Sequence, residues 1–260
     1  MQAQRDGLCD VNPPPHLRRR VTSVRSRRAS LTDAQQRTWA RLWPELGVDV
    51  GPQPPGRLDT DAWFGRSAPV VLEIGCGTGI STAAMAREEP HIDVVAVEVY
   101  KRGLAQLLGA IDREQITNIR LIRGDGLDVL EHMLGTESLT GVRVFFPDPW
   151  PKSRHHKRRL LQPGTIELIA DRLKPGGILH VATDHEDYAE QIAAAGDAEP
   201  RLRRAHRDFA PPISVRRPTT KYESKAHHAG STVAELIFQK RSSPGREEVN
   251  GPGREEVKRS

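Results

Sequence analysis

Residues 70–79 read VVLEIGCGTG, an apolar run that contains one acid, Glu73, and ends in glycines at 75, 77 and 79. A short run rich in Val, Leu and Ile predicts a strand that is buried on both faces. Glycines at its end permit a tight turn, and they allow a ligand to approach bare backbone at the start of the next helix. We therefore expect a strand, a ligand-binding loop and a helix in succession. The alternative is a glycine-rich turn that binds nothing.

The same alternation of strands and helices continues along the chain. Further strands are predicted at residues 93–99, 119–125, 142–146, 178–184 and 234–240. Apolar side chains spaced three and four residues apart predict helices between several of them, as at Leu104, Leu107, Leu108 and Ile111. Strands that alternate with helices form a parallel sheet covered on both faces. The predicted fold class is α/β, doubly wound.

The two ends of the chain differ from this central part. The N-terminal end is rich in Arg and Pro, and the C-terminal end repeats PGREEV. Thr32 followed by Gln35 predicts a capped helix start between the basic end and the first strand. The expected division is a flexible basic arm (1–30), an N-terminal helix and linker (31–66), the main domain (67–241) and a disordered low-complexity tail (242–260).

The composition limits the classes of partner. The net charge of +5 and the pI of about 9.5 favour an acidic partner such as nucleic acid. Only two cysteines are present, Cys9 and Cys76, which argues against a disulfide framework and a structural zinc site. No apolar run is long enough to span a membrane, and no signal peptide is recognisable. We expect a cytoplasmic protein with no metal and no membrane partner.

Acids at the ends of the predicted strands indicate the ligand. Glu98 ends the second strand, about 20 residues after the glycine loop, where an acid can accept hydrogen bonds from ribose hydroxyls. Asp125 ends the third strand and is placed to accept from an adenine amino group. The glycines follow a G-x-G-x-G pattern rather than the dinucleotide pattern G-x-G-x-x-G. These features resemble those of class I S-adenosylmethionine-dependent methyltransferases, which implies a Rossmann-like, mostly parallel seven-stranded sheet. NAD is the alternative cofactor.

Residues 145–160 read FFPDPWPKSRHHKRRL, an apolar strand end that leads into a proline-rich turn and then a basic segment. Each proline fixes its φ at about −65°, so Asp148 and Trp150 should be held rigidly beside the expected cleft. The basic segment consists of Lys152, Arg154, His155, His156, Lys157, Arg158 and Arg159. Such a run is often only a solvated face, but beside a methyl-transfer cleft it favours phosphate binding.

The sequences of three segments indicate a more specific class of protein. FFPDPWPKSRHHKRRL, TDHEDYAE (183–190) and RPTTKYE (217–223) resemble the bacterial tRNA (guanine-N7)-methyltransferases over about residues 23–240. The resemblance implies that S-adenosylmethionine is bound by Glu73, Gly75, Gly77, Gly79, Glu98, Asp125 and Asp148. It implies that Asp148 is catalytic. It also implies that the substrate is bound by Lys152, Asp184, Thr220, Lys221, Tyr222 and Glu223, and that residues 154–159 contact RNA. After Glu223 the chain reads SKAHHAGST, which departs from the family pattern.

The implied reaction is methyl transfer to N7 of a guanosine in the tRNA variable loop. This nitrogen carries a lone pair and no proton, so no general base is needed. We expect Asp148 to orient and stabilise rather than to remove a proton. The alternatives are a class I methyltransferase that acts on another substrate and a non-catalytic RNA-binding relative. The sequence does not choose between a monomer and a homodimer.

Overall fold

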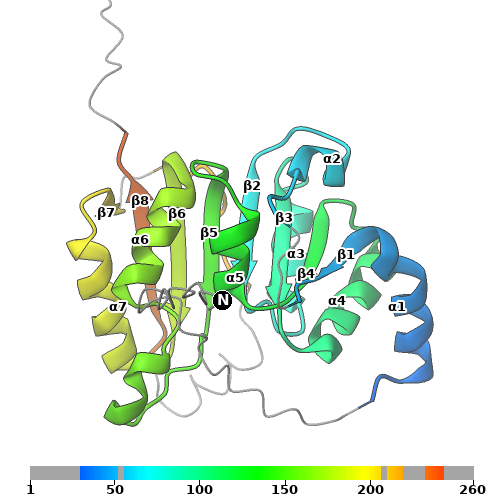
Figure 1. Ribbon diagram of the computed structural model, residues 1–260, viewed down its shortest axis with the longest axis horizontal. Coiled ribbons are helices and arrows are strands. Elements are labelled where there is room, and N and C mark those ends of the chain that lie inside the picture. Colours follow the sequence, from blue (N-terminus) through cyan, green and yellow to red (C-terminus); the bar gives the residue numbers. More distant parts are fainter. Residues whose placement is uncertain (1–29, 52–55, 206–209, 219–231, 243–260) are drawn as a thin grey trace, which may run out of the picture.

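A computed structural model describes residues 30–51, 56–205, 210–218 and 232–242. Its centre is one eight-stranded sheet in the order β1-β4-β3-β2-β5-β6-β8-β7 (Figure 1). The strands are β1 (Gly47–Asp49), β2 (Val70–Ile74), β3 (Asp93–Glu98), β4 (Ile119–Arg123), β5 (Leu139–Phe145), β6 (Leu173–Thr183), β7 (Leu202–Arg204) and β8 (Ala234–Lys240). Strand β8 pairs antiparallel with β6 and β7, and the other pairings of this sheet are parallel. The predicted α/β, doubly wound, mostly parallel fold is confirmed.

Helices cover both faces of the sheet. They are α1 (Asp33–Leu46), α2 (Thr60–Phe64), α3 (Ile80–Glu88), α4 (Lys101–Glu114), α5 (Gly126–Asp128), the π-helical turn η2 (Val129–Met133), the 3-10 helix η3 (Ser153–Arg158), α6 (Pro163–Arg172) and α7 (Glu186–Ala198). Successive side chains of a strand point to opposite faces. Val94 and Ala96 of β3 therefore pack with α1, α3 and α4, whereas Val95 and Val97 pack with α6, α7 and η2.

The N-terminal segment adds one strand to the seven that were expected. Strand β1 pairs in parallel with β4, with Gly47 opposite Leu121. The residues before it form the predicted helix α1, and the side chain of Thr32 accepts a hydrogen bond from Gln35 N–H at 3.3 Å in a capping box. This N-terminal segment thus extends the sheet through β1, while the proposed domain boundaries remain a prediction.

The sheet brings the ends of its central strands to one edge. Strand β2 lies between β3 and β5, so the chain turns in opposite directions on its two sides. In open α/β sheets, ligands bind beyond the carboxyl ends of the strands at such a switch point. The structure therefore predicts that the site lies where β2, β3, β4 and β5 end.

Across the described ranges, no helix combines the length and the apolar character that a membrane span requires.

Candidate active site

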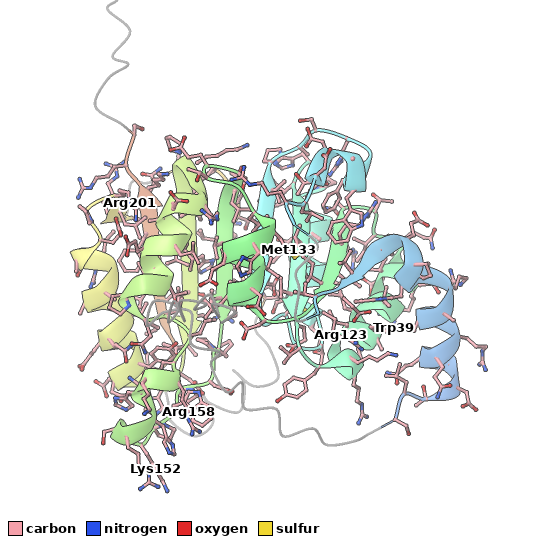
Figure 2. All side chains as sticks on the ribbon, in the orientation of Figure 1. Trp39, Arg123, Met133, Lys152, Arg158 and Arg201 are labelled. Carbon is pink, nitrogen blue, oxygen red and sulfur yellow. The ribbon has the colours of Figure 1, made fainter. Side chains whose placement is uncertain are left out.

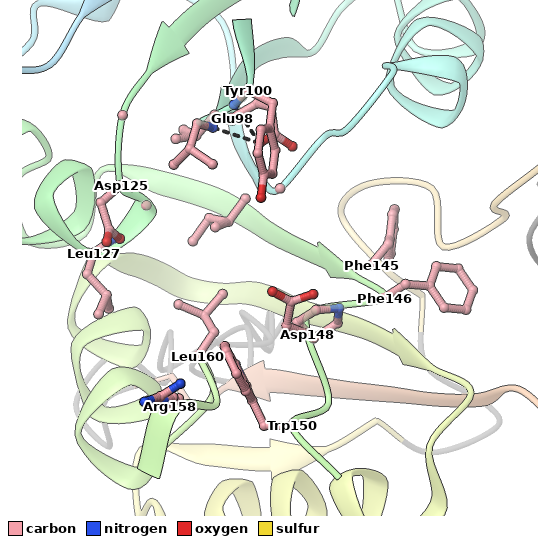
Figure 3. Close-up of a pocket in the computed structure, with 17 residues that line it drawn as sticks. Glu98, Tyr100, Asp125, Leu127, Phe145, Phe146, Asp148, Trp150, Arg158 and Leu160 are labelled. Atoms are coloured by element: carbon pink, nitrogen blue, oxygen red, sulfur yellow. Dashed lines mark hydrogen bonds between the residues drawn. The ribbon is translucent and has the colours of Figure 1, made fainter. Parts of the chain in front are cut away.

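A cavity of about 260 Å³ opens at this edge of the sheet (Figure 3). Its lining includes Gly75 from the glycine loop, Glu98 and Tyr100 from the β3–α4 junction, Asp125 after β4, and Asp148 with Trp150 after β5. Four predicted site residues, Gly75, Glu98, Asp125 and Asp148, are thus brought to one cavity from the ends of four different strands.

The glycine loop leaves open space beside its backbone. Gly75, Gly77 and Gly79 have φ angles of +79°, +56° and +73°, in the left-handed region that favours glycine. A Cβ atom at Gly75 or Gly77 would meet no heavy atom within 4 Å, whereas one at Gly79 would lie 2.6 Å from Leu107 of α4. The first two glycines can therefore admit a ligand, and the third allows close packing of α4.

Glu73 lies beneath this loop and is only 2% exposed. Its Oε1 accepts a hydrogen bond from Thr82 Oγ1 at 2.9 Å, and its Oε2 has no hydrogen-bond partner among the described residues. Burial raises the pKa of Glu73, and the positive charge of Arg143 and the hydroxyl of Thr82 act in the opposite direction. Glu73 does not itself line the cavity, but it offers a buried acceptor directly below the loop.

Glu98 connects the loop to the start of α4. Its Oε2 accepts from Gly77 N–H at 2.9 Å, and its Oε1 accepts from the N–H groups of Val99 and Tyr100 at 2.7 and 3.0 Å. Gly103 of α4 packs directly against the loop, because a Cβ atom at this position would lie only 2.2 Å from the carbonyl oxygen of Gly77. Glu98 therefore fixes the loop while its carboxylate remains at the cavity wall.

Two further groups of the cavity differ from the sequence prediction in detail. Asp125 lies beyond the end of β4 and caps α5, where its Oδ1 accepts from Leu127 N–H at 2.9 Å. Tyr100, which the sequence did not single out, is 43% exposed and lines the cavity. Partial burial and the charges of Asp148 and Glu98 raise the pKa of Tyr100, so its hydroxyl stays protonated beside both carboxylates.

The proline-rich turn has an unexpected backbone conformation. Phe146 and Trp150 have φ angles of +51° and +44°, although each precedes a proline and should by local rules be extended. Asp148 between them is exposed at the cavity, with Trp150 on the same wall (Figure 3). The rigidity of the turn stays a prediction, and its shape depends on contacts with the rest of the fold.

The basic segment continues from the turn into η3. Lys152, Arg154, Lys157 and Arg158 are exposed, and Figure 2 shows Lys152 and Arg158 at the same end of the molecule. Arg158 lines the cavity, and its guanidinium carbon lies 5.0 Å from the centroid of the Trp150 ring. His155 meets the same ring edge-on, and His156 lies 3.5 Å from Asp187. The cations thus lie directly beside the cavity.

Arg159 does not belong to this exposed group, and its burial argues against the predicted RNA contact. It is 1% exposed. Its guanidinium donates to Pro149 O at 2.8 Å, to Gln191 Oε1 at 2.8 Å and to Asp187 Oδ2 at 2.6 Å. It also lies 4.7 Å from the Tyr188 ring. Arg159 therefore fastens the proline-rich turn to α7 and is not accessible to a phosphate.

Comparison with known proteins agrees with this geometry. Residues 67–236 match a protein-family model described as "Putative methyltransferase". The chain is 69% identical over 242 residues to the tRNA (guanine-N(7)-)-methyltransferase of Mycolicibacterium vanbaalenii, covering 89% of this chain and 91% of the relative. It is 68% identical over 234 residues to that of Mycolicibacterium gilvum, covering 87% and 89%. The enzyme of Mycobacterium leprae (strain TN) is 65% identical over 224 residues, covering 85% and 97%.

The chain belongs to the tRNA (guanine-N7)-methyltransferase family. The remaining residues that the family resemblance assigned to the substrate are only partly described. Lys152 is exposed beside the turn, and Asp184 is exposed directly after β6. Thr220, Lys221, Tyr222 and Glu223 lie outside the described residues.

Several residues of this family member were missed by the sequence reasoning. Tyr100 and Gly103 follow the second strand closely, so their positions were a usable signal. Arg143 lies within the apolar run of β5 and is fully buried, and Arg217 begins the segment RPTTKYE. Nothing in the local sequence indicates what these two arginines contact.

One group of possible metal ligands lies outside the cavity. The ligand atoms of Asp128, Glu131 and His132 are within 4.8 Å of one another. Asp128 and His132 are exposed, and acidic surface groups of this kind are common without a metal. We assign no metal to it.

Proposed function

We propose that the chain transfers the methyl group of S-adenosylmethionine to N7 of a guanosine in the tRNA variable loop. The observation that carries this proposal is a single cavity that gathers the glycine loop, strand-end carboxylates and a proline-fixed aspartate, with exposed cations beside it. Family membership supports the reaction and the RNA substrate. A tRNA partner and a cytoplasmic location are part of the same proposal.

The residues fit S-adenosylmethionine. Within the part of the chain that the structure describes, one buried oxygen of Glu73 has no hydrogen-bond partner, and Gly75 and Gly77 border open space. Negative side chains suit the positive sulfonium and amino groups of the cofactor, Glu98 suits its ribose, and Asp125 suits its adenine. When bound, the cofactor supplies a methyl group on a sulfonium, a carrier that needs no protein nucleophile.

Asp148 is proposed to place and stabilise the guanine rather than to deprotonate it. Because N7 has no proton, the site must supply alignment and a negative potential for the positive charge that develops on the purine. Asp148 is exposed at the cavity within a turn that contains three prolines, which suits both tasks. We assign Lys152, Asp184 and residues 220–223 to the binding of the nucleotide, as the family resemblance implies.

The exposed cations are proposed to bind tRNA phosphates. The target guanosine must be drawn out of its stack, which costs about a few kcal/mol. Phosphate contacts from Lys152, Arg154, Lys157 and Arg158 offset this cost, and the partly exposed ring of Trp150 suits stacking on a base.

The test is a methyl-transfer assay with purified protein, tritiated S-adenosylmethionine and unmodified tRNA, followed by nucleoside analysis. Label in N7-methylguanosine supports the proposal. Label in another nucleoside or in a different molecule would assign the chain to another methyltransferase reaction. Binding of tRNA with no label transferred would favour a non-catalytic RNA-binding role.

A further inference from the structure

A segment that we call the strap, residues 213–217, runs along one face of β5. Gly141, Arg143 and Phe145 are spaced two residues apart along β5, so they share one face of the sheet. Ile213 packs over Gly141, where a Cβ would lie only 2.3 Å from its Cδ1. Further on, Arg217 lies against Phe145. The strap thus follows β5 toward the end that carries Asp148.

The first half of the strap is anchored by a buried ion pair. Arg143 is fully buried, and its Nη2 donates to Glu89 Oε2 at 2.7 Å and to the carbonyl oxygen of Ser214 at 3.2 Å. The other Glu89 oxygen accepts from Ser214 N–H at 2.6 Å. Ser214 is therefore held by both the Arg143 guanidinium and the Glu89 carboxylate, and this part of the strap cannot shift along the strand without breaking these hydrogen bonds.

The second half of the strap ends in a clamped arginine. The Arg217 side chain is 4% exposed, and its Nε donates to Glu235 Oε1 at 3.0 Å. Its guanidinium carbon lies 5.6 Å from the Phe145 ring centroid and 5.1 Å from that of Phe146. Glu235 lies in β8 opposite Ala182 of β6, so the sheet fixes the backbone that carries this carboxylate. Arg217 is thus enclosed by a carboxylate and two aromatic rings.

The rings that Arg217 touches determine how the chain leaves β5. Phe146 has a φ of +51°, a strained conformation for an aromatic residue that persists only where the surroundings hold it. Its N–H is bound to Ala182 O at 2.8 Å. The contact with Arg217 holds the side chain of Phe146. Asp148 follows only two residues later, so the orientation of Phe146 sets the direction of the turn.

We propose that Arg217, fixed by Glu235, is a positioning residue for methyl transfer that holds Phe145 and Phe146 and thereby directs Asp148 into the cavity. The role of Asp148 in this statement rests on the proposed function. Because the Arg217 side chain is enclosed, it acts through the turn and not through a phosphate.

The kinetic test compares Arg217→Met and Arg217→Lys with a matched control, Arg120→Met. Arg120 is also buried, lies 4.7 Å from the Phe64 ring and stands at the amino end of β4, away from the cavity. A misplacement of about 1 Å can cost about 100-fold in rate. We expect Arg217→Met to lower kcat by about tenfold to 100-fold, with the dissociation constant for S-adenosylmethionine and the salt dependence of tRNA binding unchanged. Arg217→Lys should recover part of the loss, and Arg120→Met should leave kcat intact even where it lowers Tm.

A second variant tests the link to Glu235. Glu235→Gln should lower kcat in the same direction as Arg217→Met, and the double variant should be no slower than Arg217→Met alone. Multiplied effects in the double variant would show that the two residues act separately and would overturn the clamp.

A readout that needs no catalysis separates this inference from the proposed function. The chain contains four tryptophans, so labelling with 5-fluorotryptophan gives a fluorine NMR signal for Trp150 that Trp150→Phe assigns. That signal should move or broaden in Arg217→Lys and Glu235→Gln, and stay in place in Arg120→Met. An unmoved signal together with an unchanged kcat would refute the positioning role. If the wild-type chain methylated no N7, the signal would still decide whether Arg217 orders the turn.

Discussion

The exposed cations beside the cavity allow a quantitative prediction for tRNA binding. The perturbation is the replacement of Lys152, Arg154, Lys157 and Arg158 by serine. All four are exposed, whereas Arg159 of the same segment is buried and bonded to the protein. The number of phosphates that the segment can neutralise is therefore four rather than the five that the sequence suggests.

The magnitude follows from counterion release. Each neutralised phosphate contributes about −0.7 to −0.9 to the slope of log affinity against log salt, so four contribute about −3. The serine variant should lose about three units of slope. Over a fourfold rise in salt, the segment alone then accounts for about a 60-fold loss of affinity in the wild type that the variant does not show.

The assay is a titration of fluorescent tRNA at several salt concentrations. A matched control replaces Arg87, Lys174, Arg203 and Arg204, which are exposed away from the cavity, and its slope should change little. Arg159→Met should lower stability by about 3 kcal/mol, because it removes buried hydrogen bonds to a charged group, but it should not flatten the slope. An unchanged slope in the fourfold serine variant, or an equal loss in the control, would refute the reasoning.

Three further predictions concern the cavity. Asp148→Asn should lower kcat strongly, while the wild-type pH–rate profile stays flat around neutral pH; a rise there would instead indicate a general base. Burial raises the pKa of Glu73, so acidification should protonate Glu73 at a higher pH than an exposed glutamate and should thereby weaken binding of the cationic cofactor. Calorimetry should find the midpoint of this loss of affinity above pH 4.5. Arg143→Met should move the midpoint higher, because Arg143 lowers this pKa, and Glu73→Gln should abolish it. Gly103→Ala should weaken cofactor binding by about tenfold, because its Cβ would lie 2.2 Å from Gly77 O, whereas Gly109→Ala on the same helix meets nothing within 4 Å and should bind normally; equal affinities would contradict the account of the loop.

The buried strands could be predicted because their apolar runs are unambiguous. The run at 70–75 corresponds to Val70–Ile74, and residues 234–240 form β8 as expected. Strands β1 and β7 are three residues long and carry no periodic signal, so only their pairing with β4 and β8 reveals them. Pairing with neighbours also extends β6 back to Leu173, through a Pro-Gly-Gly stretch that reads locally as a helix stop.

The acids of the site could be predicted for a similar reason: a parallel sheet places all its strand ends at one edge. Tertiary contacts could not. Arg158 and Arg159 are adjacent and chemically identical, yet one is exposed and the other is buried, because Asp187 and Gln191 of α7 face only the second. The left-handed conformation of Phe146 contradicts the local rule for a residue before proline, since Arg217 and Ala182 hold it from elsewhere in the chain.

The central claim is that this cavity delivers a methyl group to one ring nitrogen of tRNA. Borohydride reduction followed by aniline treatment cleaves RNA at N7-methylguanosine, and so it reports the atom and the position together. After incubation with S-adenosylmethionine and the wild-type chain, we predict one new cut, at a guanosine of the variable loop, and none with Asp148→Asn. Methyl incorporation without any such cut, or cuts spread over many guanosines, would contradict the account.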